Sequence, residues 1–256
     1  MQETLQDEDQ GGERKAPTGG AVISDIHMFA QRSSLPEHTR AIHRHAARSA
    51  FFVLNGDIFD FKWAQASLEI TMESAVAWLT ELCEAHAHCQ FHYVLGNHDG
   101  VEGFAAKLAT LEGAVPNFHW HSTHVVIGTA LFVHGDLPLS RKRGSHSFKR
   151  QLKPDSDIKV KGRLASLGYQ ALVSVRVLPA VRVIWPNRRV SKRMGTRLSL
   201  HSEAHPAACD FGAITDVYFG HTHVAFSGIE HQSVRYHNTG AMIQTVKAAI
   251  FRVEGE

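Results

Sequence analysis

Carboxylate, imidazole and amide side chains recur in five short segments of the chain, each at the end of an apolar run. Ligands of these types, with no thiolate among them, are typical of Mn, Fe or Zn ions that take part in hydrolysis rather than of a closed structural zinc site. Two such ions about 3.5–4 Å apart can bind the attacking and the leaving oxygen of a displacement at phosphorus. The residue types therefore predict hydrolysis of a phosphate ester. The five segments are Ser24-Asp25-Ile26-His27, Asn55-Gly56-Asp57, Gly96-Asn97-His98-Asp99, His134-Gly135-Asp136 and Gly220-His221-Thr222-His223.

In order and content, the five segments resemble the motifs of the calcineurin-like metallophosphoesterase superfamily, over roughly residues 21–240. The resemblance implies an α/β fold, a four-layer αββα sandwich in which two sheets face each other. It also implies two divalent ions, Mn first with Fe and Zn as alternatives, and attack on phosphorus by a hydroxide held between them. The ligands that the resemblance implies are Asp25, His27, Asp57, Asn97, His134, His221 and His223.

The resemblance also divides these ligands between the two ions. By this resemblance, Asp57 corresponds to a carboxylate that bridges both ions. A shared anion offsets the repulsion between two cations. The first ion would take Asp25, His27 and His223. The second ion would take Asn97, His134 and His221.

Three further residues of the motifs have roles beside the ions. The resemblance places His98 at the scissile phosphate, where an imidazole that titrates near neutrality can protonate the leaving oxygen. Asp99 would hold the other ring nitrogen of His98 and keep the ring cationic. Asp60 would orient the ligands from the outer shell of the centre.

Short apolar runs end directly in these motifs, and their pattern is typical of buried strands. The runs are Ala21–Ile23, Phe51–Leu54 and Phe91–Leu95. We expect helices between them at Glu37–Arg48 and Ser67–Ala87. Alternating strands and helices predict a parallel sheet, and the site of such a sheet lies beyond the carboxyl ends of its strands.

The second half of the chain predicts a further set of strands. His124–Ile127 and Thr129–Val133 flank Gly128 and are typical of a tight hairpin that leads to His134. Asp216–Phe219 would be another buried strand, leading to His221 and His223. The remaining strands are expected at Val234–His237 and Met242–Val253.

Composition indicates one folded domain of residues 20–256 after a disordered tail of residues 1–19, which is polar and charged and has no apolar core. The three cysteines are an odd number without metal-type spacing, and reduced thiols in the cytoplasm fit them better than disulfides. No run of about 18 apolar residues predicts a membrane span.

Residues 140–200 form a basic segment that fits neither sheet. They hold 16 lysines and arginines against Asp155 and Asp157, a formal charge of +14, while the rest of the chain carries −12. We expect an inserted helical cap, with a helix at Gly162–Val177 and an apolar stretch at Val173–Trp185, that contacts an anionic substrate or the surface of a membrane. A solvated helical insertion packed on the core is the alternative. The residues expected to bind substrate are Arg141, Arg143, Lys149 and Arg150.

A basic cap between the fourth and fifth motifs resembles that of bacterial UDP-2,3-diacylglucosamine diphosphatases, which are peripheral membrane enzymes. This resemblance implies a lipid-linked or nucleotide-sugar pyrophosphate as substrate. Those enzymes typically carry an arginine at the position of His98, so a general phosphodiesterase or phosphatase acting on nucleotides or other small phosphoesters stays open as the alternative.

Two functions from other classes of protein are the further alternatives, a nuclease and a non-catalytic scaffold. A nuclease would need metals and a basic surface, but nucleic-acid grooves generally combine cations with stacking aromatics, of which the basic segment has few. A non-catalytic scaffold would be expected to have lost ligands, and every ligand type is present. We therefore expect an enzyme that acts on a phosphorylated small molecule or lipid-linked substrate rather than on nucleic acid. The sequence does not predict an oligomeric state.

Overall fold

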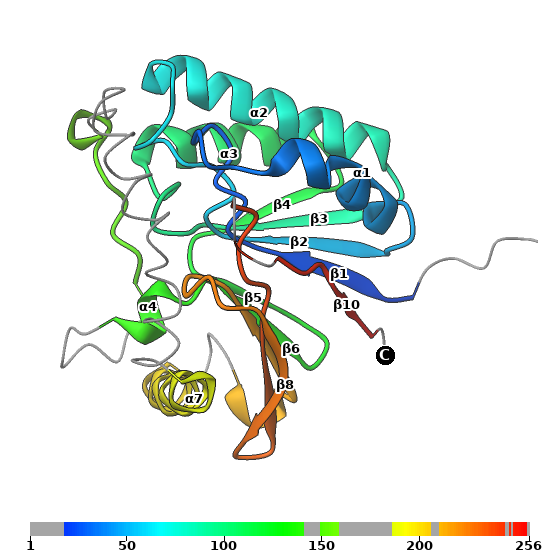
Figure 1. Ribbon diagram of the computed structural model, residues 1–256, viewed down its shortest axis with the longest axis vertical. Helices are drawn as coiled ribbons and strands as arrows, with labels where there is room; N and C mark the ends of the chain where they lie inside the picture. Colours follow the sequence, from blue (N-terminus) through cyan, green and yellow to red (C-terminus); the bar gives the residue numbers. More distant parts are fainter. Residues whose placement is uncertain are drawn as a thin grey trace, which may run out of the picture.

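Two five-stranded sheets face each other, with helices on the outer face of each (Figure 1). The computed structural model describes residues 18–140, 149–158, 186–205, 210–243, 246 and 248–254. The arrangement of helix, sheet, sheet and helix confirms the four-layer α/β sandwich expected from the sequence.

The first sheet has the strand order β10-β1-β2-β3-β4, in which β1 to β4 are parallel and β10 is antiparallel to β1. Helices α1, α2 and α3 pack against its outer face through a large apolar core. The strands are β1 (Gly20–Ile23), β2 (Phe51–Asn55), β3 (Gln90–Val94), β4 (Phe118–His121) and β10 (Phe251–Val253). The helices are α1 (Leu35–Ala46), α2 (Leu68–Ala85) and α3 (Glu102–Ala114).

The second sheet has the strand order β5-β6-β7-β9-β8, with β6, β7 and β9 parallel to one another. Helix α7 (Asn187–Ala204) covers its outer face through Val190, Met194 and Leu198. The strands are β5 (His124–Ile127), β6 (Ala130–Val133), β7 (Asp216–Phe219), β8 (Phe226–His231) and β9 (Val234–Asn238). The short elements are α4 (Asp136–Leu139), η1 (Asp155–Asp157) and η2 (Phe211–Ala213).

Side-chain alternation along the strands explains why both faces of the first sheet are apolar. On β2, Phe52 and Leu54 pack against the helices, whereas Val53 between them packs against the second sheet. Successive strand residues point to opposite faces, so a strand buried on both sides reads as a continuous apolar run. The second sheet completes the inner core with Phe132 and Tyr218.

Most of the expected elements are confirmed, with ends that differ by a few residues. Helix α3 was not predicted, and the strand predicted at Met242–Val253 is wrong for most of its length, because only Phe251–Val253 joins a sheet. Residues earlier in that range form isolated bridges instead, such as Ile243 with Ser33. The tail before residue 18, the predicted helix Gly162–Val177 and the stretch Val173–Trp185 lie outside the described residues.

A helix that crosses a bilayer needs about 20 consecutive, mostly apolar residues. Among these residues, no helix is both long and apolar enough to cross a bilayer.

Candidate metal centre

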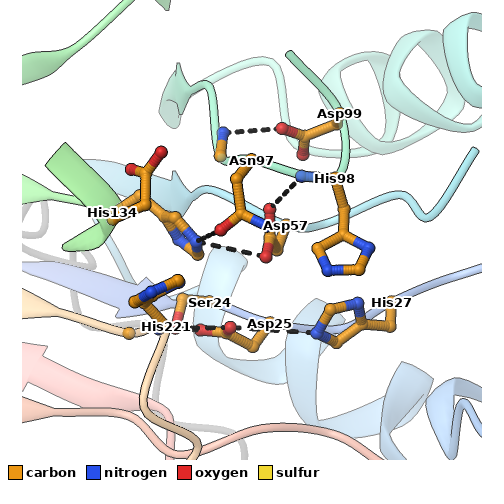
Figure 2. Close-up of polar contacts among 12 residues, drawn as sticks. Ser24, Asp25, His27, Asp57, Asn97, His98, Asp99, His134 and His221 are labelled. Carbon is orange, nitrogen blue, oxygen red and sulfur yellow. Dashed lines mark hydrogen bonds and ion pairs between the residues drawn. The ribbon is translucent and has the colours of Figure 1, made fainter. Parts of the chain in front are cut away.

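The ligand residues expected from the sequence follow the carboxyl ends of β1, β2, β3, β6 and β7. Parallel pairing brings these ends to one edge of each sheet, and side chains from the two sheets meet there (Figure 2). For example, His134 Nε2 of the second sheet lies 3.1 Å from Asp57 Oδ2 of the first. The structure therefore brings together residues that are far apart in the chain.

Left-handed backbone turns let neighbouring ligands converge. On an extended strand, side chains two residues apart point to the same face but lie about 6–7 Å apart along it, and a turn brings them closer. Positive φ angles occur at five of the seven expected ligands: Asp25 (53°), His27 (50°), Asp57 (53°), His221 (64°) and His223 (56°). Such conformations cost about 1–3 kcal/mol each in residues other than glycine, and they cluster at functional sites.

Two glycines make room for the ligands. Gly56 has a φ of +82°, and a Cβ there would lie 2.6 Å from the ring of His134. A Cβ on Gly96 would lie 2.1 Å from Oδ1 of Asp57. Any larger residue at either position would displace a ligand, which explains why glycine precedes Asp57 and Asn97 in their motifs.

One group of ligands consists of Asp25, His27 and His223. His223 Nε2 lies 3.1 Å from Asp25 Oδ1, and His27 Nε2 lies 3.2 Å from His223 Nε2. Burial alone would raise the pKa of Asp25, but the hydrogen bond with His223 and the charges of the nearby histidines lower it to about 2. Burial lowers the pKa of His27 to about 4, so this imidazole is neutral and able to bind a cation.

A second group consists of Asp57, His134 and His221, with Asn97 beside it. The Nδ1 atom of His134 lies 3.2 Å from the carbonyl oxygen of Asn55, which can only accept, so Nδ1 carries a hydrogen. In the neutral ring, Nε2 then directs its lone pair at Asp57 Oδ2 and at Asn97 Oδ1, which is 3.3 Å away. Two oxygen acceptors facing a lone pair require a positive charge between them.

The electrostatics of His134 lead to the same conclusion. Burial lowers its pKa, but the charge of Asp57 and the hydrogen bond with it, together with Asp25 and Asp136, raise the pKa to about 10. Divalent ions supply such charge without a proton, and the donor set of carboxylate, imidazole and amide oxygen suits them. The residues present therefore fit a metal centre.

Asp57 is the residue shared between the groups. It belongs to one group with His134 and His221 and to another with His27 and His98. Its Oδ1 also accepts a hydrogen bond from the backbone N–H of His98 at 2.8 Å. A carboxylate in this position can contact ions on both sides.

The prediction that Asp99 holds the His98 ring is wrong. Asp99 accepts hydrogen bonds from the N–H of Ile58 (3.0 Å), the hydroxyl of Tyr93 (2.6 Å) and the N–H of Gly96 (2.6 Å), and so it joins two loops. Its buried carboxyl group faces these donors, and the carboxylate beside the His98 ring is that of Asp60 instead.

Asp60 takes the place that was expected for Asp99. Its Oδ1 lies 3.0 Å from His98 Nδ1, although the ring N–H is not aligned well enough for a hydrogen bond. Its Oδ2 lies 3.3 Å from Nδ1 of His27. Burial lowers the pKa of His98, but the charges of Asp57 and Asp60 outweigh it and raise the pKa. Asp60 thus lies beside both a ligand and the catalytic candidate.

Of the four residues expected to bind substrate, the structure describes Lys149 and Arg150. Arg141 and Arg143 lie outside the described residues, and Lys149 is exposed. The prediction is wrong for Arg150, whose guanidinium is buried and bonded to Ser122, Gly96 and Asp136. Four of the five N–H groups of a guanidinium are used in this way, so little remains for a substrate.

Lys153 is a functional candidate that the sequence did not single out. Its Nζ donates to the carbonyl oxygen of Asn97, one of the expected ligands. It lies in the basic segment among many other cations, so no sequence signal distinguishes it.

The chain has detectable similarity to known proteins. The model of the calcineurin-like phosphoesterase family matches residues 21–225. Among solved structures, the chain is similar to a dimetal phosphatase from Danio rerio, with 14% sequence identity, a TM-score of 0.45 and coverage of 94% of both chains. No curated protein matches the sequence.

Proposed function

The chain belongs to the calcineurin-like phosphoesterase family and is a phosphoester hydrolase, and from this premise we propose how its residues divide the work. The observation that carries the proposal is that ligands from both sheets converge around Asp57. One ion would be held by Asp25, His27 and His223, the other by Asn97, His134 and His221, with Asp57 between them. When bound, two divalent ions neutralise the carboxylates and bind the attacking and leaving oxygens of a displacement at phosphorus.

We propose that His98 moves the proton that the leaving group needs. Its Nδ1 faces Asp60, so Nε2 is the atom available to the substrate. The side chain is 22% exposed, which gives it access to a bound phosphate. Asp60 keeps the ring oriented and favours its charged form, as a general acid requires.

Hydrolysis of a simple phosphodiester by Mn-loaded protein tests this function. Asp57→Asn should abolish turnover, because the carboxylate shared by the two groups loses a charge. Arg235→Gln is the matched control, since it breaks an ion pair with Asp216 at the opposite end of β7. Turnover of metal-loaded Asp57→Asn at the wild-type rate would overturn the proposal.

For the substrate, we propose a lipid-linked or nucleotide-sugar pyrophosphate. Its support is the basic segment of residues 140–200, in whose described part Lys149 is exposed, as are Arg188, Arg189 and Lys192 of α7. A segment with so many cations favours a substrate with more than one negative charge. Mn is the metal we propose, because the donor set has oxygen and imidazole ligands and no thiolate.

A panel of soluble UDP-sugars, acylated UDP-sugars in detergent and a simple phosphodiester would test this choice. The proposal predicts that kcat/KM is highest for a pyrophosphate and that its KM rises with salt, because exposed charges are screened. A preference for the simple phosphodiester with no salt dependence would instead support the second candidate, a general phosphodiesterase, which His98 favours. Binding of anionic vesicles would distinguish a membrane contact from binding of the free substrate.

A further inference from the structure

Arg150 joins the two sheets at the edge where the metal ligands lie. Its Nε donates to the carbonyl of Ser122 at 2.7 Å, and its Nη1 donates to the carbonyl of Gly96 at 2.9 Å. Nη1 and Nη2 also donate to the two carboxylate oxygens of Asp136, at 2.9 and 2.8 Å. The Arg150 side chain is 4% exposed, so water competes little for these bonds.

The partners of Arg150 belong to different sheets. Gly96 follows β3 and Ser122 follows β4 in the first sheet, whereas Asp136 follows β6 in the second. Gly96 directly precedes Asn97, and Asp136 comes two residues after His134. The side chains of these two ligands face each other across the gap between the sheets, with Asn97 Oδ1 3.3 Å from His134 Nε2.

We infer that Arg150 is a positioning residue for one metal ion, because it fixes the distance between Asn97 of the first sheet and His134 of the second. The inference rests on the proposed function, since it requires the two-ion centre. A planar guanidinium with a bidentate carboxylate contact sets both distance and angle, which a lysine cannot do.

Asp25, a ligand of the other ion, is held to the second sheet without Arg150. The backbone N–H of His221 in the second sheet donates to Oδ2 of Asp25 in the first, at 3.0 Å. Asn55 adds a further connection, because its Nδ2 donates to the carbonyls of Val133 and Tyr218 at 3.2 and 3.0 Å. Loss of Arg150 should therefore weaken the binding of one ion selectively while the sheets stay joined.

Calorimetric titration of the metal-free full chain with Mn tests the inference. Wild type should show two binding events. Arg150→Ala should weaken one event by about 10–100-fold, the usual effect of losing a partner that orients a ligand, and leave the other unchanged. Added guanidinium ion should restore the weakened event, and Arg150→Lys should lie between the two. Arg235→Gln, which also removes a bidentate arginine–carboxylate pair, should leave both events as in wild type.

Kinetics provide an independent readout on the same variants. With a phosphodiester substrate, Arg150→Ala should have a lower kcat than wild type at limiting Mn, and its kcat should recover as the Mn concentration increases. Its KM should stay at the wild-type value. Equal weakening of both binding events, or wild-type binding of both, in folded Arg150→Ala or Arg150→Lys would overturn the inference alone. Wild-type protein that binds no Mn would overturn the proposed function and the inference with it.

Discussion

Asp60 lies beside His98, with its Oδ1 atom 3.0 Å from the ring Nδ1. The second oxygen of Asp60 lies 3.3 Å from Nδ1 of His27, so one carboxylate orients both a metal ligand and the candidate proton donor. Asp99, the chain neighbour of His98, instead faces backbone N–H groups and the Tyr93 hydroxyl. Asp60 therefore serves the orientation of His98, whereas Asp99 stabilises the loops, and the two roles can be tested separately.

The first prediction concerns the leaving group. His98→Gln should lower kcat by about 10²–10⁴-fold for an alkyl phosphoester, which needs a proton on departure, and much less for a p-nitrophenyl ester, which does not. Asp60→Asn should show the same dependence on the leaving group to a smaller degree. Comparing kcat across esters of graded leaving-group pKa measures the effect. An equal loss for all esters would contradict the role of His98.

The second prediction concerns Asp99 and stability. Asp99→Ala leaves three buried donors without an acceptor, and each unsatisfied donor costs about 1–3 kcal/mol. We expect the free energy of unfolding in urea to fall by about 3 kcal/mol or more on this basis. Tyr93→Phe, which removes one of the three bonds, should lose less. If Asp99→Ala loses no more than Tyr93→Phe, the assignment of a structural role is wrong.

The third prediction concerns metal removal. A chelator should abolish hydrolysis, and added Mn should restore it. Mn should also raise the melting temperature, since a ligand at about 100 times its Kd stabilises the folded state by about 2.7 kcal/mol. Thermal denaturation with and without Mn measures this. Asp57→Asn should show a much smaller rise, and an equal rise would place the bound metal elsewhere.

The fourth prediction concerns pH and a pair of histidines outside the set of metal ligands. His92 Nδ1 and His121 Nε2 are 3.2 Å apart, and the rings stack with interplanar angles of 21° to each other and 29° between His92 and His119. Burial, together with the neighbouring histidines, lowers the pKa of both His92 and His121 to about 4, against an opposing effect of Glu112 on His121.

The sign of the pH effect follows from these values. In the unfolded chain histidine titrates near a pKa of about 6.5, so on acidification the unfolded state takes up the proton first. The contribution of this pair is complete above about pH 6.5 and is lost as the pH falls toward about 4. Urea unfolding of metal-free protein at neutral pH and at about pH 5 should show a smaller loss for the double variant His92→Gln, His121→Gln than for wild type. Identical losses would show that the pair does not titrate on unfolding.

The sequence determined the types of ligand and where each stands relative to its strand. Apolar runs such as Phe51–Leu54 and Asp216–Phe219 are buried on both sides, so the pattern alone indicates strands that lead to Asp57 and His221. The spacing of apolar residues also predicted helix α2, and the structure adds a cap at Ser67, whose side chain accepts from the N–H of Ile70. The expectation that two sheets face each other came from the family resemblance.

Only the tertiary structure decided which side chains meet. Arg150 is one of many cations in its segment, and only packing shows it buried against Asp136 rather than facing a substrate. In the same way, Asp60 reaches His98 although Asp99 is adjacent in the chain, and Phe251–Val253 pairs with β1 across most of the sequence. The local sequence pattern identifies a strand and the residues that follow its end. Contacts between distant segments depend instead on how the whole chain packs.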